Sequence, residues 1–192
     1  WAVFTAEPLT RILQALHVLL VAPTDKLLGV RDAFKRTGDH KTMLITLYRP
    51  DAYASGFYAW GVGADGIYLH DVFDADPLYN PFHFNGRSLM LPTDDYKFEP
   101  TLAMMQIGQG LADYRLAGRC ERLVAAVRER NREASDGEPK MDAAALAKVL
   151  GEIRNIADAS PPNYDDSLLR SSNVPPDQLR TWRTRLIAEA EK

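Results

Sequence analysis

The sequence predicts an α/β protein in which strands alternate with helices along the first part of the chain. The clearest observation is residues 41–76, where an apolar stretch, an aromatic stripe at helical spacing and a second apolar stretch follow one another. The same alternation occurs upstream, over residues 9–38. Because consecutive strands crossed by helices must be parallel, we expect a parallel sheet with right-handed crossovers, as in a repeat of a β/α barrel or a doubly wound sheet.

Four elements precede the aromatic stripe. Apolar residues at helical spacing over residues 9–16 predict a helix, and residues 17–22 predict the first strand behind it. Residues 27–34 repeat the helical spacing before Gly38, which ends this second helix. Residues 43–47 are nearly all apolar and too few for a free-standing helix, so we expect a second strand that is covered on both faces.

The aromatic stripe belongs to a helix that begins near Asp51, directly after Pro50. Tyr53, Phe57 and Trp60 follow at steps of four and three, so the three rings share one helical face. We expect this face to pack in the core; stacking of Trp60 on a sugar ring is the alternative.

Glycines end the aromatic helix and a third strand follows. Gly61 and Gly63 can take the left-handed cap conformation at little cost, and residues 67–69 then form the strand. Asp65 and Gly66 lie where this strand begins, so we expect them to form a turn.

The later part of the chain is helical. A long aromatic and proline-rich loop over residues 77–100 leads into a helix over residues 101–130. A polar linker over residues 131–140 precedes two more helices, at residues 141–158 and 176–191. The apolar stripe expected on the long helix is Ile107, Leu111, Tyr114, Leu116, Cys120, Leu123 and Val127. The predicted domains are residues 1–130, a partial β/α unit, and residues 131–192, a helical C-terminal extension.

Composition restricts the class of partner and site. The net charge of −3 argues against a basic face that would bind nucleic acid, and no apolar stretch approaches the roughly 20 residues of a membrane span. Cys120 is the only cysteine, which excludes an internal disulfide, and we expect it to be a small buried residue. His83 has no second His or Cys at ligand spacing, and no glycine-rich phosphate loop follows a strand, so we predict neither a metal nor another cofactor.

The candidate site residues follow the three predicted strands. Parallel strands place their carboxyl ends at one edge, where binding residues of α/β proteins gather. Asp71 and Asp74 could bind sugar hydroxyls or act as acid or base, and loop aspartates that bond locally are the alternative. Arg49 could serve the same edge or pair with Asp51. The predicted substrate-binding residues are Asp71, Asp74, Asp25, Tyr48, Arg49 and His70, of which His70 and Asp71 alternate out of phase.

Three pieces of the chain together resemble a known family. They are FYAWGVGADGIYLHDVFDAD at residues 57–76, NGRSLMLP at residues 85–92 and TLAMMQIGQGLADYRLAGRCERLV at residues 101–124. In order and spacing they are similar to the C-terminal part of the glycoside hydrolases that include family 123, the β-N-acetylgalactosaminidases. The resemblance implies a (β/α)8 barrel whose last three strands are those predicted above, and a secreted or periplasmic location is among those it allows.

The resemblance does not extend to the catalytic pair. The family's adjacent Asp and Glu have no counterpart, because no Asp-Glu dipeptide occurs in this sequence. The chain opens on Trp1, and a closed barrel needs about 250 residues, so we expect strands before residue 1 and a partner chain or oligomer that completes the sheet. Two functions stay open: a glycoside hydrolase, or its C-terminal portion, with catalytic carboxylates outside this chain, and a non-catalytic carbohydrate-binding or accessory protein. A third possibility, an unrelated nucleotide-binding α/β domain, lacks its phosphate loop.

Overall fold

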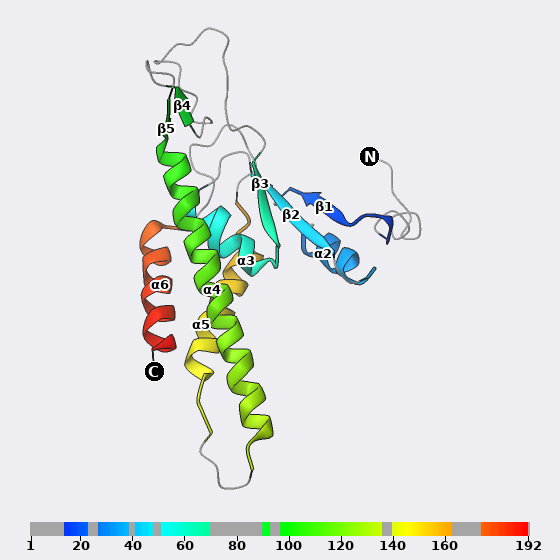
Figure 1. Ribbon diagram of the computed structural model, residues 1–192, viewed down its shortest axis with the longest axis vertical. Coiled ribbons are helices and arrows are strands. Elements are labelled where there is room, and N and C mark those ends of the chain that lie inside the picture. Colours follow the sequence, from blue (N-terminus) through cyan, green and yellow to red (C-terminus); the bar gives the residue numbers. More distant parts are fainter. Residues whose placement is uncertain are drawn as a thin grey trace.

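In the computed structural model a small parallel sheet stands beside a layer of helices (Figure 1). The structure describes residues 14–22, 27–38, 41–47, 51–69, 90–92, 97–135, 140–162 and 174–191. The elements are β1 (Val18–Val21), α2 (Leu27–Lys35), β2 (Thr42–Leu47), the π-helix η1 (Ala54–Tyr58), α3 (Ala59–Gly61), β3 (Gly66–Leu69), β4 (Met90–Pro92), β5 (Phe98–Pro100), α4 (Leu102–Glu133), α5 (Ala144–Ala159) and α6 (Pro176–Ala190).

The parallel sheet has three strands in the order β1, β2, β3. Val21 at the end of β1 is paired with Ile45 of β2, and Leu47 at the end of β2 is paired with Leu69, the last residue of β3. The predicted strands and their parallel pairing are therefore confirmed. The carboxyl ends of all three lie at one edge of the sheet.

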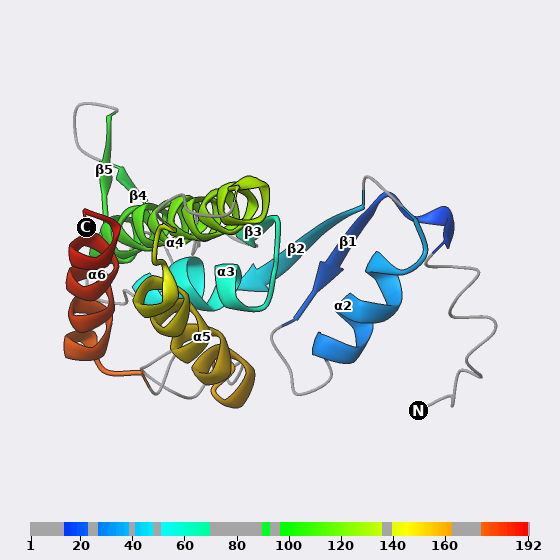
Figure 2. The same cartoon turned by 90° about the horizontal axis from the view of Figure 1, so that it is seen from below.

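Only one face of the sheet is covered by the described helices. Side chains alternate between faces along a strand, and in β2 Met43, Ile45 and Leu47 are buried while the residues between them are partly exposed. The buried face packs with α2 and the η1–α3 segment (Figure 2). The prediction that β2 is covered on both faces is thus wrong for the described part of the molecule.

The prediction of a (β/α)8 barrel portion is also wrong. The described strands form an open three-stranded sheet in which β1 and β3 each have a single partner, together with a separate two-stranded pair. A barrel requires every strand to be paired on both sides. After β3 the described chain adds no further parallel strand, and α4, α5 and α6 pack on one another and on η1 instead. The α/β class is retained, with a helical layer in place of a barrel wall.

The aromatic helix is confirmed as a core element, although its first turns form a π-helix. Tyr53, Phe57 and Trp60 are buried. Gly63 has a φ of 69° and ends the helix as predicted, whereas Gly61 lies within it. A Cβ on Gly61 would lie 2.6 Å from the Cβ of Ala157 in α5, so this glycine permits close helix packing.

Helix α4 begins with a side-chain cap, since Thr101 accepts a hydrogen bond from the Met104 amide. The expected apolar stripe is only partly correct, because Leu111 and Leu123 are exposed. The buried residues of α4 are Ile107, Gly110, Asp113, Ala117, Cys120, Val124 and Val127. Small residues take the place of large ones because η1 lies almost against the α4 backbone. A Cβ on Gly56 would be 2.6 Å from the Gly110 carbonyl oxygen.

Helices α5 and α6, which lie in the expected C-terminal extension, share the core of the preceding segment. Trp182 of α6 is fully buried and meets Phe57 of η1 edge to face, with 5.4 Å between ring centroids. The boundaries of both helices agree with the prediction to within three residues. None of the described helices is both long and apolar enough to cross a membrane.

The predicted loop before α4 contains a short antiparallel pair. β4 and β5 are paired with Met90 opposite Pro100 and Leu91 opposite Glu99. The pair extends from the N-terminal end of α4 (Figure 1). Most of the loop, with Asn85, Gly86 and His83, lies outside the described residues.

Candidate functional site

The carboxyl edge of the parallel sheet is the site that the sequence predicts. The register places Val21 of β1, and Leu47 and Leu69 of β2 and β3, at this edge. The six predicted substrate-binding residues come shortly after these strand ends, and all six lie outside the residues that the structure describes: Asp25, Tyr48, Arg49, His70, Asp71 and Asp74. The structure therefore gives the edge itself but not the arrangement of the predicted side chains.

Asp51 is the described carboxylate nearest in sequence to this edge, and it supports the start of the aromatic helix. Its Oδ1 accepts a hydrogen bond of 2.7 Å from the Ala54 amide, and its carbonyl oxygen accepts one of 2.6 Å from the Ser55 hydroxyl. The first bond is a capping interaction of a helix N-terminus, and in the second a helix hydroxyl bonds to the carbonyl four residues earlier. The alternative pairing of Asp51 with Arg49 stays a prediction, since Arg49 lies outside the described residues.

The surroundings of Trp60 indicate a role in packing and not in stacking on a sugar ring. Only 5% of its surface is exposed, and its indole nitrogen donates to a carboxylate oxygen of Glu121 at 3.1 Å. The guanidinium of Arg154 lies 4.5 Å from the ring centroid and is itself paired with Glu121. A sugar would have to displace this arginine from the ring face, so the expectation that Trp60 serves packing is confirmed.

Asp113 is the one charged residue that is buried among those that the structure describes, and the sequence did not reveal its partner. Arg183 of α6 donates from Nε to Oδ1 at 2.5 Å and from Nη2 to Oδ2 at 2.8 Å, a bidentate geometry. Burial raises the pKa of the Asp113 carboxyl, and the Arg183 guanidinium opposes this rise. Both oxygens are engaged within a helix interface, so the pair joins α4 to α6. Asp113 therefore has a structural role.

Tyr53, Tyr58 and Tyr114, whose hydroxyl groups could in principle donate a proton, also have structural roles. Burial raises the pKa of Tyr53 and Tyr58 well above the ordinary value. The Tyr53 hydroxyl donates to the Ser160 carbonyl at 3.1 Å, and that of Tyr114 donates to the Ala64 carbonyl at 2.7 Å. These bonds tie the helices to one another and to the start of β3.

The turn before β3 is fixed by Asp65, as the sequence predicted. Its carboxylate accepts a hydrogen bond of 2.8 Å from the Met43 amide, and its own amide donates to the Met43 carbonyl at 2.8 Å. This turn lies at the amino end of β3, opposite the carboxyl edge.

Arg31 and Lys35 of α2 donate to the carbonyl oxygens at the end of the aromatic helix, where cations are favourable.

Metal and thiol chemistry have no support in the described residues. No group of three His, Cys, Asp or Glu side chains there is arranged to hold a metal ion. Cys120 is buried, and burial raises the pKa of its thiol, which disfavours the reactive thiolate. Its predicted role as a small buried residue is confirmed.

No family model, curated protein or solved structure matches this chain. The resemblance to the family 123 glycoside hydrolases therefore stays a prediction from the three sequence pieces. The physical evidence for a site is the common edge of three parallel strands.

Proposed function

We propose that this chain is a glycoside hydrolase, or the C-terminal portion of one, and binds carbohydrate at the carboxyl edge of its parallel sheet. The observation that supports this is the register that brings the ends of β1, β2 and β3 to one edge. Open parallel sheets bind ligands outside the carboxyl ends of their strands. In the sequence these ends are followed by groups that bond to sugar hydroxyls: the carboxylates of Asp25 and Asp71, the guanidinium of Arg49 and the phenol of Tyr48.

The catalytic carboxylates would come from outside this chain. Glycoside hydrolysis needs two carboxyl groups about 5–5.5 Å apart for retention or about 6.5–9.5 Å apart for inversion. Asp113, the buried carboxylate of the described residues, is already bound by Arg183. Under this proposal Asp71 and Asp74 hold the substrate beside a catalytic pair that another part of the enzyme supplies.

A second candidate is a carbohydrate-binding or accessory protein without hydrolytic activity. The absence of an Asp-Glu dipeptide from the sequence favours it. Such a protein would bind the same oligosaccharides at the same edge but release no sugar. Measuring binding and hydrolysis on the same sample separates the two candidates.

We also propose that another polypeptide segment, a partner chain or a further copy, covers the bare face of the sheet and extends its edges. Val18, Leu20 and Tyr68 lie on this face with 51%, 49% and 42% of their surfaces exposed. Parallel strands are almost always covered on both faces, and unpaired edges of a sheet pair with other chains. The apolar character of this face supports a protein cover.

Substitution of Asp71 tests the carbohydrate proposal. Asp71→Asn should weaken binding of oligosaccharides, measured by calorimetry over a panel of neutral and N-acetylated sugars, without lowering the melting temperature. Asp177→Asn on the distant α6 helix is the control, since Asp177 is exposed. If Asp71→Asn lowers the melting temperature and leaves the affinity unchanged, Asp71 is structural and the proposed site is wrong. Release of reducing ends by the wild-type chain alone would place catalytic residues within it.

A further inference from the structure

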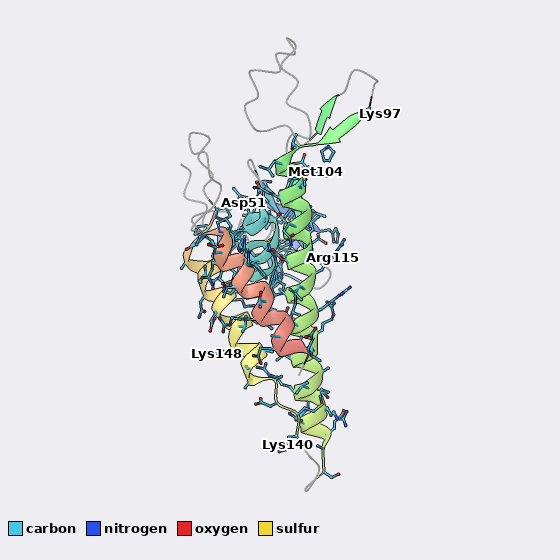
Figure 3. All side chains as sticks on the ribbon, turned by 90° about the vertical axis from the view of Figure 1, so that its left-hand side faces the viewer. Asp51, Lys97, Met104, Arg115, Lys140 and Lys148 are labelled. Atoms are coloured by element: carbon cyan, nitrogen blue, oxygen red, sulfur yellow. The ribbon has the colours of Figure 1, made fainter. Side chains whose placement is uncertain are left out.

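The outward face of α4 carries charges in an unusual order. Six exposed residues at steps of four and three lie on the side of the helix opposite its buried residues, and we call them the α4 stripe. They are Arg115, which Figure 3 labels on α4, and Arg119, Arg122, Ala126, Glu129 and Glu133. Helix α4 lies at the margin of the helical layer, with α3 and α5 on its inner side (Figure 2). The stripe is thus basic at one end, small in the middle and acidic at the other end.

Six arginines of the described residues have a carboxylate partner and those of the α4 stripe do not, although Arg36, Arg128 and Arg130 outside the stripe also lack one. Arg31, Arg132, Arg154, Arg180, Arg183 and Arg185 each have a carboxylate partner. Within the described part of the chain, Arg115, Arg119 and Arg122 have none, and neither has Glu133. Like charges four residues apart on a helix destabilise it by about 0.2–0.5 kcal/mol. The three arginines thus repel one another without a compensating carboxylate in the described chain.

We propose that the α4 stripe is a dimer interface, on which a second copy of this chain lays its own stripe antiparallel. Arg115 and Glu133 lie equally far along the sequence on either side of Val124, and so do Arg119 and Glu129. An antiparallel helix pair centred at Val124 therefore places Arg115 against Glu133 of the second copy. The twofold axis repeats each ion pair, as an isologous interface requires. The paired segment spans about 27 Å at 1.5 Å per residue.

The middle of the α4 stripe is suited to close approach of two helices. The antiparallel arrangement places Arg122 against Ala126 of the second copy, and exposed Ala125 adjoins this position. Small side chains allow interaxial distances near the lower end of about 8–10 Å. The methylene groups of Arg122 can then cover the alanines while the guanidinium remains in water.

The charge order favours a second copy over other partners. A polyanion such as a nucleic acid or an acidic polysaccharide would meet Arg115 favourably but would be repelled by Glu129 and Glu133. Binding of single-stranded nucleic acid also uses exposed aromatic rings, and the α4 stripe contains none. A face with the opposite order of charges is required, and the antiparallel copy of this helix supplies it.

Charge reversal tests the interface with the full chain. One variant carries Arg115→Glu and Arg119→Glu, and a second carries Glu129→Arg and Glu133→Arg. Sedimentation velocity over a range of protein concentrations should show a salt-sensitive dimer for the wild type. Each variant alone should have a dimer affinity at least about tenfold lower than the wild type, because like charges then face one another across the interface. An equimolar mixture of the two should recover a heterodimer.

A matched control excludes an effect of net charge. Arg36→Glu with Arg128→Glu changes the net charge by the same amount as Arg115→Glu with Arg119→Glu, on exposed positions outside the α4 stripe, and should dimerise as the wild type does. Circular dichroism verifies that all variants remain folded. A wild type that stays monomeric, or a dimer that survives both charge reversals, would overturn the proposal. Binding of monomeric wild type to heparin, lost with Arg115→Glu and Arg119→Glu, would also overturn it and assign the arginines to an anionic partner.

Discussion

Phe57 and Trp182 meet edge to face, with ring planes at 82° and centroids 5.4 Å apart. The two residues come from elements far apart in the chain, the π-helix after β2 and the last helix. Both are fully buried. Aromatic pairs in this geometry contribute about 0.5–1.5 kcal/mol beyond the burial of their area. The α6 helix is therefore part of the same core as the helix that covers the sheet.

Phe57→Ala should behave as a core mutation and cost about 3–5 kcal/mol of unfolding free energy. The substitution leaves a cavity beside Trp182 and between Tyr53 and Trp60. Urea denaturation followed by Trp fluorescence measures the loss. Ile187→Ala on α6 is the comparison, since Ile187 is 46% exposed and should lose much less. A loss within about 0.5 kcal/mol for Phe57→Ala, as at surface sites, would mean that the aromatic face is not packed as described.

Arg183→Ala should cost about 3–5 kcal/mol at neutral pH, because it leaves the Asp113 carboxylate buried without a partner. The pKa of Asp113, already raised by burial, should rise further. A raised folded-state pKa gives stability that is present at acid pH and lost as the pH rises above the ordinary carboxyl value of 3.8. The variant should therefore regain stability on acidification relative to the wild type.

Denaturant unfolding of both proteins at acid and neutral pH checks this prediction. Arg180→Ala is the control, because Arg180 is 76% exposed and 3.6 Å from Asp177. Such surface pairs contribute about 0–1 kcal/mol. Equal losses for Arg183→Ala and Arg180→Ala would show that the Asp113 pair contributes no more than a surface one.

Alkaline pH should destabilise the protein through its buried tyrosines. Burial raises the pKa of Tyr53 and Tyr58 above the ordinary value of 10.0. The unfolded chain therefore loses these protons first, and stability falls as the pH rises above about 10. Tyr58→Phe removes one of the two groups, and no hydrogen bond of the Tyr58 hydroxyl is present among the described residues. Thermal melts at neutral and alkaline pH should show a smaller loss of stability for this variant than for the wild type. An unchanged pH dependence would contradict the burial of the Tyr58 hydroxyl.

Local pattern was sufficient to predict most elements of this fold. Apolar spacing predicted α2, α4, α5 and α6 nearly at their observed bounds, because helical periodicity is a property of a short stretch of sequence. The parallel pairing of the strands also followed from the alternation of strands and helices. The prediction of a barrel portion was wrong, because a pattern of three parallel strands is compatible with either an open or a closed sheet. The bare face of β1 and β3 could not be predicted from the sequence, because apolar residues such as Val18 and Leu20 occur on covered and on exposed strand faces alike.

The candidate site was predictable only as an edge. Strand ends followed by Asp71 or Arg49 indicate where polar groups gather, but their geometry depends on segments outside the described residues. The bond between Asp113 and Arg183 had no signal in the sequence, because its two residues lie on α4 and α6, which are separated in the chain by α5 and its flanking segments. The buried glycine of α4 was missed for a related reason: a pattern of apolar residues does not mark a contact made by the backbone.

That glycine gives the last prediction, because Gly110 and Gly108 lie on one helix in opposite environments. A Cβ on Gly110 would lie 2.7 Å from the Ala52 carbonyl oxygen and 3.0 Å from the Gly56 amide nitrogen, both backbone atoms of the helix packed against it. Gly110→Ala should therefore destabilise by about 1–3 kcal/mol through overpacking, although alanine is the better helix former. A Cβ on Gly108 would have nothing within 4 Å, so Gly108→Ala should stabilise by about 0.5–1 kcal/mol. Urea denaturation of the two variants should thus give changes of opposite sign, and a stabilising Gly110→Ala would show that η1 does not lie against α4 at this distance.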